Sequence, residues 1–250
     1  MLRLKRLLIF TLFAVSLING FSFWATRPPG ADAIGSLAAP PRAGAKLEML
    51  STGITTAVNV TPSPDAQWLI RAAAQTGIPA RALRAYVAAA ATANESAPMC
   101  GIGWNTVAAV GSVESAHGTY GGGSLNTLGQ ATGPIVGPSL DGNGFAAIAD
   151  TDAGALDGDS RWDHAVGPMQ FIPSTWQLAG RDGNGDGTAD PSNIDDAALS
   201  AATYLCANGR DLTTAQGWTN AIYSYNQSNP YIRQVRAQAT AYAAETGTAE

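Results

Sequence analysis

The chain has 250 residues, of which 46% are hydrophobic and 13% are charged, and its formal net charge is −5. This length allows one globular domain of ordinary size with appended segments. Because no cluster of Lys and Arg follows the first few residues, the composition excludes the basic surface of a nucleic-acid-binding protein, and it leaves uncharged polymers such as glycans as partners.

An export signal is predicted at the N-terminus. Basic residues precede an apolar run from Leu7 to Ala25, which is the order found in secretory signals. We predict either a signal peptide within 1–33, cleaved near Ala33, or an uncleaved membrane anchor, since the run approaches the roughly 20 residues of a membrane span. Both interpretations place the rest of the chain outside the cytoplasm, in the cell envelope or secreted.

A linker and one mainly helical domain are expected after this signal. Residues 34–62 are rich in Pro, Ala and Gly without a sustained period, which predicts an extended linker. In the domain, 63–250, Ser63 and Pro64 suit the start of a first helix and Gly77 its end. The further helices are predicted at about 79–90, 104–117, from 173 onward, 193–206, 212–225 and 231–244.

Glu114 is the candidate catalytic residue. Val107, Val110 and Glu114 recur at spacings of three and four, so they share one face of the predicted helix, which Gly118 ends. A carboxylate on an apolar face is costly unless it is paired or protonated, and desolvation raises its pKa as a general acid near neutral pH requires. The alternative is that Glu114 faces solvent on the other side of the helix.

A Gly-rich stretch from Tyr120 to Trp162 follows and lacks helical periodicity. A stretch of this length inside a domain is usually functional or disordered, and we predict loops that wall a cleft beside Glu114. Six acids are either candidates for a second catalytic carboxylate or ordinary solvated loop residues, namely Asp141, Asp150, Asp152, Asp157, Asp159 and Asp163.

Gln170 lies in the short apolar run Met169 to Ile172, after the predicted turn at Gly167. A buried amide needs hydrogen-bond partners. The partner is either a hydroxyl or N-acetyl group of a sugar substrate, or the backbone of a neighbouring loop.

A calcium loop is predicted after this run. Oxygen-bearing side chains occupy positions one, three and five and glycine occupies position six, as in the first half of an EF-hand loop. Position twelve is Asn193 instead of Glu, so we expect either Asp195 or Asp196 to close a lengthened site. A polar turn without metal is the alternative. The ligands expected for Ca²⁺ are Asp182, Asn184, Asp186, the backbone of Thr188 and, as the closing acid, Asp196.

Cys100 and Cys206 are the only cysteines. An even pair in an exported protein predicts a disulfide, and two free buried thiols are the alternative.

Three segments taken together resemble a known family. They are Val113-Glu-Ser-Ala-His-Gly118, Gly167-Pro-Met-Gln-Phe-Ile-Pro-Ser-Thr-Trp176 and Tyr223-Ser-Tyr-Asn226. This order is similar to the transglycosylase domain of lytic murein transglycosylases. The predicted calcium loop and the segment from Gly77 to Tyr86 look like the membrane-bound lytic transglycosylase B branch.

The resemblance implies a lysozyme-like helical fold with long Gly-rich loops and an EF-hand-like calcium loop. It implies cleavage of the β-1,4 bond between N-acetylmuramic acid and N-acetylglucosamine of peptidoglycan, with formation of 1,6-anhydro ends. Glu114 matches the single catalytic acid and base, Gln170 the residue that holds the substrate, and Tyr225 with Asn226 the pair that lines the cleft. A hydrolytic muramidase and a non-catalytic glycan-binding module are the rival functions.

Overall fold

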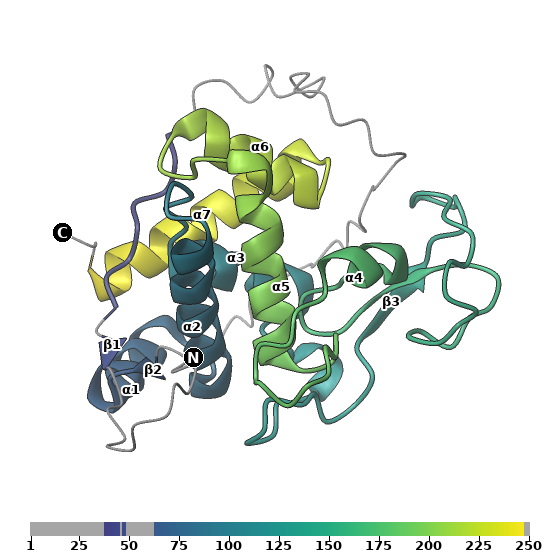
Figure 1. The fold of residues 1–250 in the computed structure, drawn as a ribbon, viewed down its shortest axis with the longest axis horizontal. Coiled ribbons are helices and arrows are strands. Elements are labelled where there is room, and N and C mark those ends of the chain that lie inside the picture. Colours follow the sequence, from purple (N-terminus) through teal and green to yellow (C-terminus); the bar gives the residue numbers. More distant parts are fainter. Residues whose placement is uncertain (1–37, 46, 49–62, 248–250) are drawn as a thin grey trace, which may run out of the picture.

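The computed structural model describes residues 38–45, 47–48 and 63–247. This part of the chain is mainly helical, as predicted, with seven α-helices and two small sheets (Figure 1). The helices are α1 (Ala66–Thr76), α2 (Ala80–Ser96), α3 (Trp104–Ser115), α4 (Pro173–Ala179), α5 (Ile194–Cys206), α6 (Ala215–Tyr225) and α7 (Asn229–Thr246).

Helix α3 runs through the centre of the domain. Every residue from Trp104 to Gly111 is buried, and a helix that is buried on all sides is a core helix. Helix α2 packs against both α3 and α5, and α7 packs against α3. Small residues permit this close packing: a Cβ atom at Gly111 would lie 2.2 Å from the hydroxyl of Tyr86 on α2.

Helix ends follow local chemistry. Gly77 ends α1 in the left-handed conformation at φ +69, as predicted. The N-cap of α1, however, is Asp65, whose carboxylate accepts a hydrogen bond from the backbone N–H of Trp68. Ser63 and Pro64 instead form strand β2 (Ser63–Pro64), which pairs with β1 (Leu47–Glu48).

A disulfide joins Cys100 to Cys206, as predicted, with 5.3 Å between the Cα atoms. It fixes the segment before α3 to the last residue of α5. The helix that carries Glu114 is therefore tied covalently to a helix almost a hundred positions later in the chain.

Part of the predicted linker packs onto the domain. Ala43 is buried, and its backbone N–H donates to Asn105 Oδ1 on α3. The amide of Asn105 in turn donates to the carbonyl oxygens of Pro41 and Ala239. Residues 38–45, at the start of the predicted linker 34–62, thus lie against α3 and α7, where the buried amide of Asn105 fixes their backbone.

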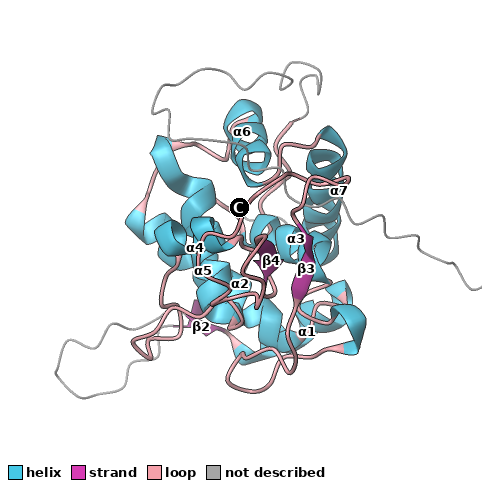
Figure 2. Ribbon diagram, turned by 90° about the vertical axis from the view of Figure 1, so that its right-hand side faces the viewer, coloured by secondary structure: helices cyan, strands magenta, loops and turns pink. Residues whose placement is uncertain are grey.

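The Gly-rich segment contains one strand, β3 (Val136–Ser139), that its composition did not indicate, and this strand forms a hairpin with β4 (His164–Val166), which follows the segment. The pairing is antiparallel, with an irregularity in register between Val136 and Ser139. The two strands lie side by side in Figure 2. In Figure 1 the loops around β3 project from the right-hand side of the helical body, on the opposite side from α1.

The predicted signal peptide or anchor at 1–33 lies outside the described residues. Within the part of the chain that the structure describes, no helix combines the length and the apolarity needed to span a bilayer.

Candidate active site

Glu114 faces the interior of the domain from the last turn of α3. Val107 and Val110, which share its face, are fully buried, and Glu114 itself keeps partial contact with solvent. Its Oε1 atom accepts a hydrogen bond of 2.5 Å from the hydroxyl of Tyr231. The alternative, a Glu114 side chain on the solvent side of the helix, is therefore excluded.

Burial raises the pKa of Glu114 from its ordinary 4.5 to about 8, and the hydrogen bond from Tyr231 opposes part of this rise. Dense protein around the carboxyl disfavours its charged form even though the residue keeps an opening to solvent. At neutral pH the carboxyl is therefore mostly protonated. A protonated carboxyl with solvent access is what a general acid requires.

Two tyrosines surround this carboxyl. Tyr231 lies in the first turn of α7, directly after Pro230, and Tyr225 is the last residue of α6. Both are buried, and burial together with the nearby Glu114 raises the pKa of each phenol well above its ordinary value. Both phenols therefore stay neutral hydrogen-bond donors at any pH at which the protein is folded.

Tyr231 was not among the site residues predicted from the sequence, because nothing in the local pattern of the final helix sets it apart. The sequence feature that could have indicated Tyr231 is its position at the start of a helix, six residues after Tyr225 and directly after Asn229-Pro230.

The turn that carries Gln170 lies against the end of α3. Ser115 Oγ donates to the carbonyl oxygen of Pro168 over 2.6 Å, and the hydroxyl of Tyr225 donates to the carbonyl oxygen of Met169 over 2.7 Å. Gly167 has φ +74, and a Cβ atom there would lie 1.8 Å from the carbonyl oxygen of Pro191. The structure thus brings the first two motifs and Tyr225 together at one place.

Gln170 uses its amide nitrogen on the protein itself. Its Nε2 donates to the carbonyl oxygens of Gly167, Ala165 and Ile135 over 3.1–3.4 Å, and its backbone is left-handed at φ +51. This is the loop-backbone alternative of the sequence analysis. The side chain holds the β3–β4 hairpin to its turn, and any contact with a substrate is left to its amide oxygen.

Asn226 follows Tyr225 and caps α6. The residue is 1% exposed, and its Nδ2 is the one buried side-chain polar atom among the described residues without a hydrogen-bond partner. An unpaired buried donor costs about 1–3 kcal/mol. Such a cost is expected where a ligand supplies the missing acceptor.

The segment predicted to bind calcium is a turn held by hydrogen bonds from its own backbone to its acidic side chains. Asp182 accepts hydrogen bonds from the backbone N–H groups of Gly185, Asp186 and Gly187, and these loop side chains are exposed. Buried Asp196 faces the loop and accepts from the backbone N–H of Gly183, Asn184 and Asp190. Burial, and to a smaller extent the charge of Asp182, raise the pKa of Asp196.

Asp195, the other acid considered for closing the loop, points elsewhere. Its carboxylate forms a bidentate pair with Arg81 on α2, with 2.9 Å between Nη1 and Oδ1. Of the two acids considered for closing the loop, Asp196 is therefore the one that faces it. Asp195 is a structural link between α2 and α5.

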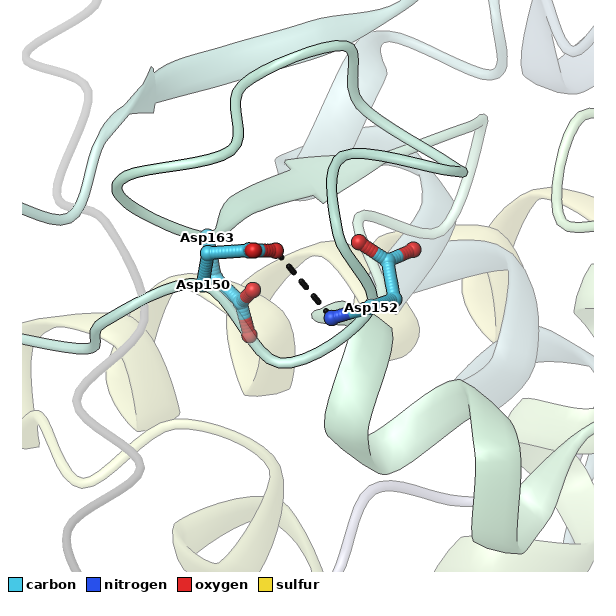
Figure 3. Close-up of side chains that lie close together, drawn as sticks. All are labelled: Asp150, Asp152 and Asp163. Atoms are coloured by element: carbon cyan, nitrogen blue, oxygen red, sulfur yellow. Dashed lines mark hydrogen bonds between the residues drawn. The ribbon is translucent and has the colours of Figure 1, made fainter.

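Three of the loop acids lie close together. Oxygen atoms of Asp150, Asp152 and Asp163 lie within 4.8 Å of one another (Figure 3). Asp163 is fully buried and accepts hydrogen bonds from the backbone N–H and the hydroxyl of Thr151. The N–H of Asp152 donates to Asp150, so this cluster orders the loop that precedes β4.

Residues 144–219 match the family model described as the transglycosylase SLT domain. This match supports the resemblance to lytic transglycosylases over that segment, which includes Gln170 and the predicted calcium loop, whereas Glu114, Tyr225 and Asn226 lie outside it. Among solved structures, the chain is similar to SltB3 from Pseudomonas aeruginosa, crystallised in complex with NAG-anhNAM-pentapeptide. The identity is 16% and the TM-score 0.44, and the similarity covers 74% of this chain and 66%, just under two thirds, of that chain. No curated protein matches the chain.

Proposed function

We propose that the protein is a lytic transglycosylase that cleaves the β-1,4 bond between N-acetylmuramic acid and N-acetylglucosamine in peptidoglycan. The observation that carries this proposal is Glu114, a carboxyl with a pKa raised to about 8 at the junction of the three motifs. Among the described residues, no second carboxylate contributes to that shift. Hydrolytic glycosidases use a pair of carboxylates, whereas a reaction whose nucleophile belongs to the substrate needs only one.

In the proposed reaction, Glu114 first donates its proton to the glycosidic oxygen as the bond from this oxygen to the muramic C1 breaks. The resulting carboxylate then takes the proton of the muramic 6-hydroxyl, whose oxygen forms a bond to C1 and closes the 1,6-anhydro ring. Glu114 ends protonated again, and no water is consumed. Tyr231 holds the carboxyl in place. The buried, unpaired Nδ2 of Asn226 would meet a substrate carbonyl or hydroxyl if the end of α6 shifts to expose it.

The mass of the products separates this function from its rivals. A 1,6-anhydro product is lighter by one water than the hydrolysed product of a muramidase. We expect digestion of purified peptidoglycan to release anhydro-muropeptides. Hydrolysed muropeptides would support the muramidase, and binding without any cleavage would support a glycan-binding module.

Replacing Tyr231 with Phe tests the setting of the carboxyl. The hydrogen bond to a charged group is worth about 1.5–3 kcal/mol, so we expect kcat to fall about ten- to a hundredfold. In the wild type, kcat/KM should fall as the pH rises through about 8, because Glu114 loses its proton there. The alkaline limb of the profile is the pH range in which kcat/KM falls. Since Tyr231 lowers the pKa of Glu114, this limb should lie at higher pH in Tyr231→Phe than in the wild type.

The prediction is checked by measuring kcat/KM as a function of pH for the wild type and for Tyr231→Phe. Thr240→Val removes a hydroxyl that donates to the carbonyl oxygen of Arg236, nine positions after Tyr231 in α7, and serves as the matched control, with wild-type behaviour expected. An unchanged alkaline limb in Tyr231→Phe would contradict the assigned contact.

We further propose that Asp182, Asn184, Asp186, the backbone of Thr188 and Asp196 bind Ca²⁺ as a structural ion. Calcium would neutralise the opposed carboxylates and hold the loop against α5, with no part in the chemistry. Calcium at a hundredfold excess over its Kd adds about 2.7 kcal/mol, which should raise the Tm by about 5–10 °C. Differential scanning calorimetry with calcium and with a chelator measures this, and Asp186→Asn should weaken the response. A Tm that responds to neither would refute the site.

A further inference from the structure

His117 is a buried titratable residue for which the proposed reaction has no use. It lies three positions after Glu114, is 7% exposed, and makes hydrogen bonds only with tyrosine hydroxyls among the contacts of its ring. Nδ1 lies 3.2 Å from the hydroxyl of Tyr86 on α2, and Nε2 lies 3.0 Å from the hydroxyl of Tyr242 on α7. The imidazole thus bridges the two helices that pack on either side of α3.

The backbone at this point is held in an unfavourable conformation. Ala116 and His117 have φ values of +51 and +63 and are not glycine, and the left-handed region is uncommon for such residues. The N–H of His117 donates to the carbonyl oxygen of Gly111, which closes the end of α3. A strained conformation persists only where its surroundings fix it, and here the two tyrosines do so.

The same helices set the position of Glu114. Tyr231, which donates to the carboxyl, lies in the first turn of α7, and Tyr242 lies further along the same helix. Tyr242 is the partner of His117 Nε2 over 3.0 Å. Glu114 and His117, three positions apart at the end of α3, are therefore both hydrogen-bonded to tyrosines of α7.

We propose that His117 is a positioning residue that ties the last turn of α3 to α2 through Tyr86 and to α7 through Tyr242, and so holds the carboxyl of Glu114 against Tyr231. This inference rests on the proposed function.

The imidazole acts in its neutral form. Burial lowers the pKa of His117 from 6.5 to about 4, and a neutral imidazole has one donor and one acceptor nitrogen. One tyrosine therefore donates to the ring and the other accepts from it. The titratable groups that face His117 are Tyr86 from α2 and Tyr242 from α7, and those that face Glu114 are Tyr231 and Tyr225. All four phenols have raised pKa values, so the bridge does not change over the pH range in which Glu114 titrates.

Three substitutions separate positioning from backbone strain. His117→Leu removes both hydrogen bonds. The amide of Asn in His117→Asn occupies the place of Nδ1 and reaches Tyr86, whereas the longer amide of Gln in His117→Gln occupies the place of Nε2 and reaches Tyr242. Because Asn tolerates the left-handed conformation better than Gln does, a purely structural role predicts that Asn is the better replacement. The positioning role predicts that Gln is the better replacement, because Gln keeps the contact with Tyr242, which lies on the same helix as Tyr231, the residue that holds Glu114.

The measurements are kcat, KM and the alkaline limb of kcat/KM, at a temperature at which circular dichroism shows each variant folded. Misplacing a catalytic group from a distance can cost up to about a hundredfold in rate, and we expect His117→Leu to lose about tenfold in kcat with KM within a factor of two. Its alkaline limb should move to lower pH, because hydration of the loosened carboxyl lowers the pKa of Glu114 by more than the weakened hydrogen bond from Tyr231 raises it; burial is the larger of the two influences. His117→Gln should recover more of kcat than His117→Asn.

Asn94→Ala is the matched control for lost stability. The Asn94 side chain makes two hydrogen bonds, to the N–H and the carbonyl oxygen of Ile102, away from the site. This variant should melt earlier but keep the wild-type kcat and alkaline limb. A His117→Leu enzyme that behaves like Asn94→Ala, or a better recovery by Asn than by Gln, would overturn the inference. A wild type that cleaves no glycan would instead overturn the proposed function.

Discussion

Replacing Glu114 with Gln is expected to abolish most of the activity, with kcat about a thousandfold lower, since general acid and base catalysis contributes about 10²–10⁴. Gln keeps the size of the side chain and can still accept the hydrogen bond from Tyr231. Glycan binding should therefore persist, and a pull-down with insoluble peptidoglycan measures it alongside turnover. Undiminished lysis by this variant would remove Glu114 from the mechanism.

The same substitution has a consequence for stability. The carboxyl of folded Glu114 has a pKa of about 8, above its ordinary 4.5, so the folded state holds a proton that the unfolded chain releases. The wild type therefore loses stability as the pH rises from about 4.5 to about 8, whereas the Gln variant has no such loss. The difference in Tm between variant and wild type should shift in favour of the variant over this interval. A constant difference would show that the carboxyl is not desolvated.

Loss of the Cys100–Cys206 disulfide is the second large effect. The bond spans a sequence separation of 106, and a closed loop of about 100 residues is worth about 4.7 kcal/mol by chain entropy. We expect the double variant Cys100→Ser, Cys206→Ser to melt about 10–20 °C lower. Its kcat at 25 °C should stay near that of the wild type, because the bond joins the far end of α3 from Glu114 to the end of α5.

Thermal unfolding of the oxidised wild type, the reduced wild type and the double variant makes the comparison. The reduced wild type and the double variant should coincide. If the reduced wild type had the same Tm as the oxidised wild type, packing alone would hold α5 to the segment before α3.

Elements with a strong local signal were predictable from the sequence. The helices follow from apolar periodicity and from capping residues such as Gly77 and Asn193, whose side chain accepts from the N–H of Asp195 at the start of α5. The spacing of Glu114 to Val107 and Val110 indicated an inward direction but left the solvent side open, and the contact with Tyr231 decides between the two. In each case, residues close together in the sequence decide the conformation.

Features that depend on distant partners were not predictable. Tyr231 meets Glu114 across 117 positions, and Ala43 is fixed by Asn105 across 62. The β3–β4 hairpin has an irregular register and no apolar alternation, so its strands lack the usual pattern. The end of α3 was predicted at Gly118, but the helix ends at Ser115, because Ala116 and His117 already adopt left-handed backbone.

The central claim is that the nucleophile belongs to the substrate and not to water. Digestion of peptidoglycan in ¹⁸O-labelled water, followed by mass spectrometry of the muramic ends, tests it most directly. We expect unlabelled 1,6-anhydro ends from the wild type and none from Glu114→Gln. Reducing muramic ends that carry the ¹⁸O label would contradict the claim and identify a hydrolase.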